Sequence, residues 1–429
     1  MSASLIVVLC FVGFTLLGMP LFAAVGLTTA VALVLIDIPV TLLAQNAFTA
    51  LQPFPLLTIP LFILAGRLME TGGMASRMIA IAQSLVGAYR GSMSMVTIFG
   101  CALFAALSGS GPATTAAIGS VTIPEMVRQG YRPRFAAAVA ASAGALGSMI
   151  PPSNLMIIYC LVAEESIPRM FLAGFVPGVS VALMLMVTAY VISVRRGYGS
   201  TGDRFSFRPL LQALWRGKWA VFAPILILGG IYGGVFTPTE AASVAVFYAL
   251  FIGVFVYREL TWDRFAEALK FTALMSGILI IIAPSLAFGQ VLAFYDMPQA
   301  VQAFLDTVAA NPFWVMVIVG LILIAVGTFM ESLAQIILFT PIFLPGLVAM
   351  GVDPIVFGIF MVMSCEIGFL TPPLGGNLNV AARLTNISIE QVSIGVLPFI
   401  LPYMVMMLVM IVFPEIITFL PDLVYGPRL

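Results

Sequence analysis

Long apolar stretches, separated by short polar turns, follow one another along almost the whole chain. A helix needs roughly 20 consecutive, mostly apolar residues to cross a bilayer, and it satisfies its own backbone hydrogen bonds inside lipid. The pattern therefore predicts an all-α polytopic membrane protein. We expect spans near residues 20–36, 56–74, 135–160, 170–194, 217–236, 241–257, 271–293, 355–371 and 392–413.

The first apolar run continues to Ile36, with a break at Gly18-Met19-Pro20. No Lys or Arg precedes this run, whereas a cleaved signal peptide usually begins with a basic segment. We therefore interpret it as a retained membrane segment. The pattern leaves open whether residues 4–18 cross separately.

Three shorter segments carry apolar side chains on one helical face. They are 262–270, 297–309 and, more weakly, 76–90. Amphipathic helices of this kind lie in the membrane interface, and that is where we expect all three. The apolar stripes consist of Trp262, Phe265, Ala266 and Leu269 in the first segment and of Val301, Phe304, Leu305 and Val308 in the second.

Two further apolar stretches, 93–127 and 312–350, are too long for one crossing. The first is interrupted by Ser-Gly-Ser-Gly-Pro at 108–112, and the second is interrupted from Gly327 to Ser332. We expect each stretch to form a re-entrant helical hairpin, in which two half-helices meet at a tip inside the membrane. The backbone at such a tip must be buried in protein or line a cavity.

A constant shift of 221 residues aligns the two halves of the chain without a gap from Pro124 to Pro177. The shift places the double proline Pro151-Pro152 on Pro372-Pro373. An internal repeat of this size in an apolar protein is typical of transporter cores. Further coinciding pairs are Pro124 and Pro345, Val127 and Val348, Gly130 and Gly351, Pro133 and Pro354, Gly147 and Gly368, Gly174 and Gly395, and Pro177 and Pro398.

The distribution of charge predicts that the repeat is inverted. The turn after the first hairpin carries Arg128, Arg132 and Arg134, whereas the equivalent turn in the second half carries only Asp353. Because cytoplasmic loops are rich in Lys and Arg, we expect the first turn inside the cell and the second outside. The expected first half is 1–194, with a hairpin near 93–127 and a broken helix near 135–160. A cytoplasmic linker at 195–218, which includes Arg204, follows it. The expected second half is 219–429, with a hairpin near 312–350 and a broken helix near 355–380.

Composition agrees with this fold and excludes several kinds of chemistry. Apolar residues make up 62% of the 429 residues and charged residues 8%, whereas a soluble domain is about half apolar and a quarter charged. The formal net charge of zero gives no basic face for nucleic acid. The absence of His from the sequence removes His-based metal sites, catalytic triads and proton relays. The four Cys lie in apolar runs without CxxC spacing, so we interpret them as small buried hydrophobes.

The two hairpin tips and the two Gly…Pro-Pro breaks form four backbone interruptions in symmetric pairs. Broken helices direct free amide and carbonyl groups at one point: amide ends favour an anion, and carbonyl ends favour a cation such as Na⁺. Neutral oxygens also suit a hard, singly charged cation, although a Ser or Thr can equally bond back to its own helix. The oxygen-bearing side chains there are Ser108, Ser110, Thr114, Asn154, Thr328, Glu331, Ser332, Thr371, Asn377 and Asn379.

Two acids, Glu331 and Glu366, are expected deep in the membrane, where a carboxylate is costly and is often functional. The position of Glu331 at a hairpin tip favours a role at the cation, in direct contact or one step removed. Glu366 could equally be a structural partner of backbone amides. Arg67 and Glu70, three residues apart on one helix, could simply pair with each other.

The sequence places no Lys or Arg in this site, because Arg383 lies beyond its last member, Asn379. An unpaired carboxylate in a medium of low dielectric constant is prohibitively costly. We therefore expect helix N-termini, bound Na⁺ and the side-chain amides of Asn154, Asn377 and Asn379 to hold the anion.

Four motifs resemble the large membrane subunit of TRAP (tripartite ATP-independent periplasmic) transporters, and the resemblance covers essentially the whole chain. It implies an elevator-type transporter of the bacterial inner membrane that couples Na⁺ flow to the uptake of organic acids such as C4-dicarboxylates or sialic acid. It also implies two partners: a periplasmic binding protein that delivers the substrate, and a small membrane subunit. The chain has no extra four-helix portion, so we expect that subunit to be separate. The motifs are LSGSGPATTAA (107–117), GSMIPPSN (147–154), GTFMES (327–332) and GFLTPPLGGNLN (368–379).

The resemblance also implies which residues form the ion and substrate sites. It implies no cofactor apart from Na⁺ as the coupling ion. The implied Na⁺ residues are Ser108, Ser110, Gly147, Gly327, Thr328, Gly368 and Thr371, to which the argument above adds Glu331. The expected substrate-binding residues are Ser110, Gly111, Thr114, Asn154, Asn377 and Asn379.

Three alternatives are distinguishable. A self-sufficient Na⁺/anion symporter of the same architecture would need no binding protein, so the gene for a binding protein beside this one would separate the two transporters. A channel would carry current without saturable uptake. An intramembrane serine protease would need a base near Ser108 or Ser110, but neither Lys218 nor Lys270 is expected in a core helix. The chain also lacks HExxH and paired-Asp motifs. An organic-acid transporter therefore fits the sequence best.

Overall fold

The computed structural model describes residues 3–87, 91–199, 206–297, 299–300, 303 and 311–427, and every regular element in these ranges is helical. Seven helices there are long and apolar enough to cross a membrane, and a bent helix pair raises this number to eight. The predicted all-α polytopic fold is confirmed. The seven are η1–α4 (Phe54–Leu57 and Thr58–Thr71), α11 (Ile167–Arg196), α12 (Phe207–Tyr232), α13–η2 (Pro238–Phe251 and Ile252–Val256), α14–η3–α15 (Trp262–Ser276, Gly277–Ile281 and Ile282–Phe294), α18 (Ser332–Ala349) and α21 (Ile389–Val412).

The N-terminal apolar run is divided where the sequence predicted. Helix α1 (Ala3–Leu16) ends before Gly18, whose φ of +77° suits glycine, and α2 (Leu21–Leu35) begins after Pro20. Helix α3 (Thr41–Ala50) follows, and α15 packs against both α2 and α3. The sequence pattern did not predict α3, because its short polar stretch Gln45-Asn46 breaks the apolar run.

The segment 262–270 is not a separate helix, contrary to the prediction, while its location in the membrane interface stays a prediction. These residues form the first turns of a continuous helical run from Trp262 to Phe294, which is a single candidate span. The side chain of Thr261 caps its start by accepting a hydrogen bond from the Arg264 N–H at 3.4 Å. The segment 76–90 corresponds to α5 (Met74–Val86), with 88–90 outside the described residues. Most of the segment 297–309 lies outside them as well.

Both predicted hairpins are present as pairs of packed helices. Helix α6 (Ser92–Ser108) turns at Gly109, which has a φ of +60°, into α7 (Gly111–Arg128). In the second half, α17 (Pro312–Gly327) turns through Thr328 to Glu331 into α18. The helices therefore end at the predicted interruptions, while the depth of the two tips in the membrane stays a prediction.

The two predicted helix breaks are also observed. Helices α8 (Pro133–Gly144) and α9 (Leu146–Met149) are separated from α10 (Asn154–Ala163) by a bend of 40°. Helix α19 (Pro354–Phe369) is separated from α20 (Gly376–Thr385) by residues 370–375, which include Pro372-Pro373. The starts of α8 and α19 differ by the 221 residues of the repeat, whereas α20 begins one residue later than α10 predicts.

The span expected at 217–236 begins earlier, because α12 starts at Phe207 inside the predicted linker 195–218. Arg204 of that linker lies outside the described residues. The spans predicted at 20–36 and 355–371 correspond to the shorter helices α2 and α19. Three of the four Cys are buried, as expected, and Cys10 is half-buried.

Helices of the two halves cross-pack at the centre of the molecule. Helix α10 packs against α18 and α19, and α20 packs in turn against α7 and α8. Two buried tyrosines fasten the halves: Tyr159 donates to the Pro354 carbonyl at 2.5 Å, and Tyr403 donates to the Ser142 carbonyl at 2.6 Å. This cross-packing brings each helix break into the neighbourhood of the opposite hairpin.

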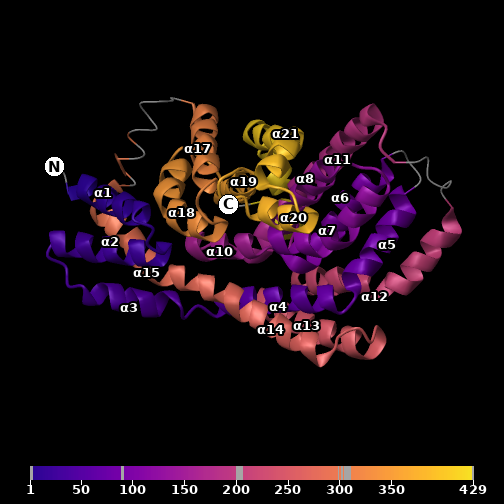
Figure 1. The fold of residues 1–429 in the computed structure, drawn as a ribbon. Helices are drawn as coiled ribbons and strands as arrows, with labels where there is room; N and C mark the ends of the chain where they lie inside the picture. The colour runs from indigo at the N-terminus through magenta and orange to yellow at the C-terminus, as the bar shows by residue number, and fades with distance from the viewer. Residues whose placement is uncertain are drawn as a thin grey trace.

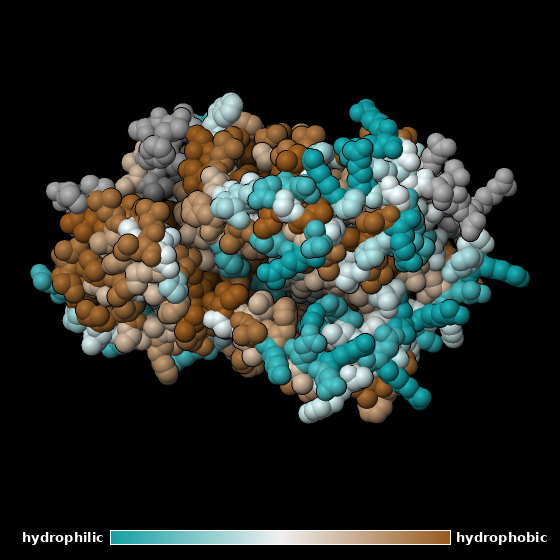
Figure 2. Space-filling view, viewed as in Figure 1, coloured by the Kyte–Doolittle hydropathy of each residue, from teal (hydrophilic) through white to brown (hydrophobic). Residues whose placement is uncertain are grey.

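Figure 1 shows α4, α13 and the α14–α15 run along one side of the molecule, facing α6–α8, α10 and α17–α21. Helix α4 packs against α13 and α14, and α12 packs against α13 and α5. Figure 2 shows apolar residues covering the end of this face that carries α1–α3, while polar residues gather toward the α5 and α12 end. The last helix, α22 (Glu415–Tyr425), packs on α11.

Candidate ion and substrate site

The tip of the first hairpin is joined to the first helix break by one backbone–backbone hydrogen bond and one hydrogen bond from the backbone to a side chain. The Gly109 carbonyl accepts from the Asn154 N–H at 3.2 Å, and the Gly111 N–H donates to the Ser148 hydroxyl at 3.0 Å. Within the tip, the Ser108 and Thr114 hydroxyls share a hydrogen bond of 2.5 Å. The free ends of α6, α7 and α10 therefore meet at one point, as broken helices must when their backbone groups are to be satisfied.

Glycine is required at this contact because the backbones approach so closely. A Cβ placed on Gly147 would lie 2.5 Å from the Ser110 carbonyl oxygen. The second half repeats the arrangement, since a Cβ on Gly368 would lie 2.6 Å from the Gly327 Cα. Gly147 and Gly368, two of the predicted ion-site residues, thus each allow the backbone of the neighbouring tip, including a carbonyl oxygen, to approach closely, and they offer no side chain of their own.

The tip of the second hairpin is held in a parallel way. The Thr328 carbonyl accepts from the Leu374 N–H at 2.8 Å. The Glu331 carboxylate caps α18 through its Oε2, which accepts from the Leu333 and Ala334 N–H groups at 2.9 and 3.3 Å. Since Oε2 makes both capping bonds, Oε1 remains available to contact another group or an ion.

Three of the predicted site residues have local hydrogen bonds. The Thr328 and Thr371 hydroxyls donate to the carbonyls of Ala325 and Ile367 at 2.8 and 2.9 Å, which is the back-bonding that the sequence left open. The Asn379 amide donates to the Leu374 carbonyl at 2.5 Å and so ties down the loop before α20. Because the Thr328 and Thr371 hydroxyls only donate in these bonds, the lone pairs of their oxygens remain available to a ligand. The side-chain amide of Asn379, by contrast, is already engaged in a hydrogen bond within its own loop.

A buried hydrogen-bond chain joins the two halves at the centre of the site. Glu366 on α19 is 1% exposed and accepts from the Asn377 amide at 3.3 Å. The same carboxylate is hydrogen-bonded to Ser148, whose oxygen accepts from the Gly111 N–H. Its observed partners are therefore side chains from both breaks, rather than the backbone amides that the sequence left open.

Four buried oxygen atoms around these tips have no hydrogen-bond partner among the described residues. They are Asn154 Oδ1, Asn377 Oδ1, Gln335 Oε1 and Ser332 Oγ. An unsatisfied buried polar atom costs about 1–3 kcal/mol, and amide oxygens can only accept. Asn377 Oδ1 lies beside the Glu366 carboxylate across from Gly111, since a Cβ on Gly111 would lie 3.0 Å from an oxygen of each. This concentration of acceptors fits a cation.

A cavity of about 510 Å³ opens beside the tips, between α4, α14 and η3 on one side and both hairpins and breaks on the other. Four of the predicted site residues line it: Ser108, Ser110, Asn154 and Glu331. Lining residues that sequence reasoning did not assign to the site include Ser148, Phe369, Gly376 and Val380. The predicted residues that do not line it are Gly111, Thr114, Gly147, Gly327, Thr328, Gly368, Thr371, Asn377 and Asn379, most of which lie behind the tips.

Arg383 is a basic side chain in this cavity, whereas the sequence led us to expect no basic residue in the site. It lines the cavity, is exposed, and makes no hydrogen bond or ion pair with any described residue. Arg67 also lines the cavity, but it is paired with Glu70 at 2.8 Å, as predicted, and with Glu267 on α14 at 3.0 Å. The cavity therefore contains one cation that no described acid neutralises.

Comparisons with known proteins agree with this architecture. The family model described as "Tripartite ATP-independent periplasmic transporter, DctM component" matches residues 7–416. The isethionate TRAP transporter permease protein DctMQ of Oleidesulfovibrio alaskensis is 42% identical over 94% of this chain, which spans 64% of that relative's length. The C4-dicarboxylate large permease protein DctM of Pseudomonas aeruginosa is 38% identical, over 89% of each chain.

Two further proteins extend the comparison. The sialic acid large permease protein SiaM of Vibrio cholerae is 35% identical over 96% of this chain and 97% of its own length. A crystal structure of the Alcanivorax borkumensis YdaH transporter matches the fold with a TM-score of 0.62 at 17% identity, covering 95% of this chain and 98% of that one. From the family model, the relatives and the apolar helices together, the chain belongs to the DctM family, the large permease component of tripartite ATP-independent periplasmic transporters, and it is a multi-pass protein of the bacterial inner membrane.

Proposed function

We propose that this protein couples inward Na⁺ flow to the uptake of a small organic acid, and that it performs no catalytic chemistry. The observation that carries the proposal is that a region rich in acceptor oxygens and a region with a free positive charge lie next to each other at the hairpin tips. Two buried acceptor oxygens without described partners, Gln335 Oε1 and Asn377 Oδ1, lie outside the lining of the cavity, whereas an unpaired guanidinium lines the cavity. The first region attracts a cation, and the second attracts an anion.

The Na⁺ ions bind behind the tips, where the acceptors are concentrated. The carbonyls that approach Gly147 and Gly368 and the lone pairs of Ser108, Thr328 and Thr371 supply neutral oxygen ligands. Glu331 Oε1 adds one carboxylate oxygen at the second tip. We also reassign Asn377 to the cation, because its amide group already donates to Glu366 and its free oxygen would repel a carboxylate.

The organic acid binds in the cavity, with its carboxylate at Arg383. A guanidinium offers two parallel donors to a carboxylate, and this one has no described acid competing for it. Ser110 and Asn154 line the same cavity and supply hydrogen bonds to the rest of the molecule. The relatives are named for isethionate, C4-dicarboxylates and sialic acid, which are all small organic anions.

Transport requires that the cavity face each side of the membrane in turn. We propose an elevator motion in which the hairpins and broken helices, arranged as the inverted repeat, move against a scaffold that includes α4 and α12–α15. The sliding contact includes Gly66 on α4, because a Cβ there would lie 3.0 Å from the Ser108 Cα. The tip of the first hairpin therefore rests directly on the proposed scaffold.

The family is the large component of a three-part transporter, and we propose that this chain works with a separate small membrane subunit and a periplasmic binding protein. The runner-up is a symporter of the same architecture that accepts free substrate. Uptake by the membrane subunits alone, unchanged on addition of the binding protein, would favour that runner-up.

The proposal is tested by measuring uptake against Na⁺ concentration in proteoliposomes that contain the assembled transporter. Ser108→Ala, Thr328→Ala, Glu331→Gln and Asn377→Ala should each raise the Na⁺ concentration needed for half-maximal uptake. Asn154→Ala should mainly weaken substrate affinity. Ser120→Ala is a matched control, because Ser120 lies on the same helix as the first tip and bonds only within that helix. Wild-type Na⁺ dependence in all four ion-site variants would refute the assignment.

A further inference from the structure

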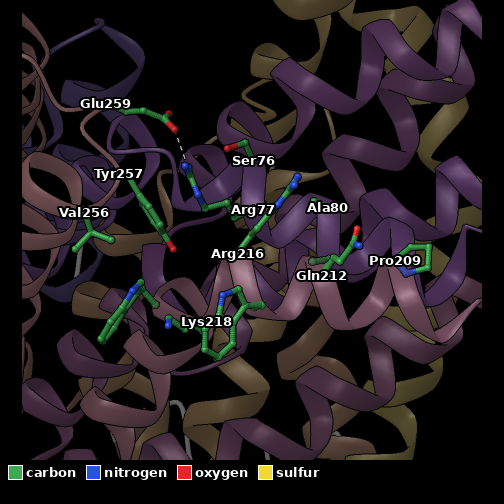
Figure 3. Close-up of a pocket in the computed structure, with 13 residues that line it drawn as sticks. Ser76, Arg77, Ala80, Pro209, Gln212, Arg216, Lys218, Val256, Tyr257 and Glu259 are labelled. Carbon is green, nitrogen blue, oxygen red and sulfur yellow. Dashed lines mark hydrogen bonds and ion pairs between the residues drawn. The ribbon is translucent and has the colours of Figure 1, made fainter.

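A second cavity, of about 660 Å³, lies away from the transport site between α5, α12 and the start of the loop after η2. Figure 3 shows Ser76, Arg77 and Ala80 of α5 facing Gln212, Arg216 and Lys218 of α12 across this pocket, with Tyr257 and Glu259 closing one side. None of its lining residues belongs to the hairpin tips or the helix breaks. Its chemistry therefore needs a separate explanation.

One of the three basic residues in the pocket is already neutralised. Arg77 pairs with Glu259 at 2.7 Å, donates to the Gly73 carbonyl at 2.6 Å and lies 3.6 Å from the centre of the Tyr257 ring. These contacts hold its guanidinium in place as part of the wall. Arg77 and Glu259 together contribute no net charge.

The other two basic residues have no acidic partner. Arg216 makes no hydrogen bond or ion pair with the described part of the chain, and it is exposed. The Lys218 ammonium lies 3.8 Å from the Trp215 ring and 5.4 Å from the Trp219 ring. A cation–π contact orients an ammonium without neutralising it. The pocket therefore carries an excess of two positive charges and suits an anion.

The surroundings of these charges are those of a membrane interface. Trp215 and Trp219 are 71% and 37% exposed, and Trp side chains typically lie at the level of the lipid headgroups. The residues belong to α12, a candidate span whose exposed face continues with Leu211 and Phe222. The positive-inside rule places this basic end of α12 on the cytoplasmic side.

We propose that this pocket binds the phosphate headgroup of an anionic phospholipid from the cytoplasmic leaflet. The phosphate occupies the pocket that both Arg216 and Lys218 line, and the acyl chains follow the exposed apolar face of α12. Basic pockets between membrane helices on the cytoplasmic side bind lipid headgroups in this way. A lipid is favoured over a soluble phosphate because the tryptophans and apolar side chains around the charges would otherwise have no apolar partner.

The bound lipid should strengthen the contact between α5 and α12. These helices already approach closely, since a Cβ on Gly217 would lie 2.8 Å from the Ile81 side chain. Helix α5 also packs against α6 of the first hairpin. A lipid that bridges α5 and α12 would therefore stabilise the folded protein and raise its unfolding temperature.

The test uses the full-length chain purified with its small membrane subunit in detergent. Phosphatidylglycerol, phosphatidylcholine or inorganic phosphate is added, and unfolding temperature and lipid retention by native mass spectrometry are measured. Phosphatidylglycerol should raise the unfolding temperature, and the other two should not. In the Arg216→Gln/Lys218→Gln double variant, phosphatidylglycerol affinity should fall about 30-fold. That factor corresponds to about 1 kcal/mol for each lost basic residue, at 1.4 kcal/mol per tenfold.

Two controls separate binding from folding. Lys270→Gln removes an exposed cation outside the pocket and should leave affinity unchanged, while Arg216→Lys keeps the charge and should retain most of it. Monodisperse elution of every variant shows that it is folded. Equal stabilisation by phosphatidylcholine, an equal effect of inorganic phosphate, or wild-type affinity in the double variant would each overturn the proposal.

Discussion

Replacing Arg383 with Gln should weaken substrate binding without preventing folding. The side chain is exposed in the 510 Å³ cavity, so its replacement breaks no described hydrogen bond or ion pair. A hydrogen bond to a charged group contributes about 1.5–3 kcal/mol. At 1.4 kcal/mol per tenfold, the dissociation constant of the organic acid should rise by about 10- to 150-fold.

The assay is isothermal titration calorimetry of the purified transporter in saturating Na⁺. The ligand is whichever of succinate, sialic acid or isethionate the protein takes up. Arg383→Lys should give an intermediate value, because it keeps the charge but loses the two parallel donors of a guanidinium. Arg132→Gln is the matched control, since Arg132 is exposed in the turn before α8 and does not line the cavity. A dissociation constant for Arg383→Gln within about threefold of wild type would refute the assignment of Arg383 to the carboxylate.

Two further predictions concern motion and topology. Gly66→Val should slow uptake by at least tenfold, because it forces apart α4 and the tip at Ser108 and overpacking costs about 1–3 kcal/mol. Unchanged uptake would exclude this contact from the sliding surface. Cysteines introduced at positions 132 and 353 should differ in labelling by an impermeant maleimide, with only position 353 reached from the periplasm, and labelling of both from one side would exclude the inverted repeat.

Much of the fold follows from local sequence patterns. The tips and breaks were located correctly because Gly and Pro interrupt helices by their own backbone geometry, whatever surrounds them. The break between α1 and α2 was identified for the same reason. The continuation of segment 262–270 into a longer helix was missed, because an amphipathic pattern also fits the end of a long helix that has one face packed against protein and the other exposed. Ala268 is buried there, while Trp262 is 77% exposed.

The contents of the site were harder to predict, because they depend on contacts between the two halves. The sequence placed Arg383 outside the site by counting residues beyond Asn379. Helical periodicity would have placed it at the cavity, because Gly376, Val380 and Arg383 recur at spacings of four and three and all line the cavity. The partners of Glu366 could not be predicted in this way, since Ser148 lies in the other half of the chain.

The central claim, that inward Na⁺ flow drives uptake of an acid handed over by a binding protein, is tested most directly by transport in proteoliposomes. Vesicles containing this chain and its small subunit would be given substrate-loaded binding protein outside, with an inward Na⁺ gradient, with an inward proton gradient alone, or with neither. The account predicts concentrative uptake only with the Na⁺ gradient and only when the binding protein is present. Full uptake driven by the proton gradient alone, or full uptake of free acid without the binding protein, would contradict it.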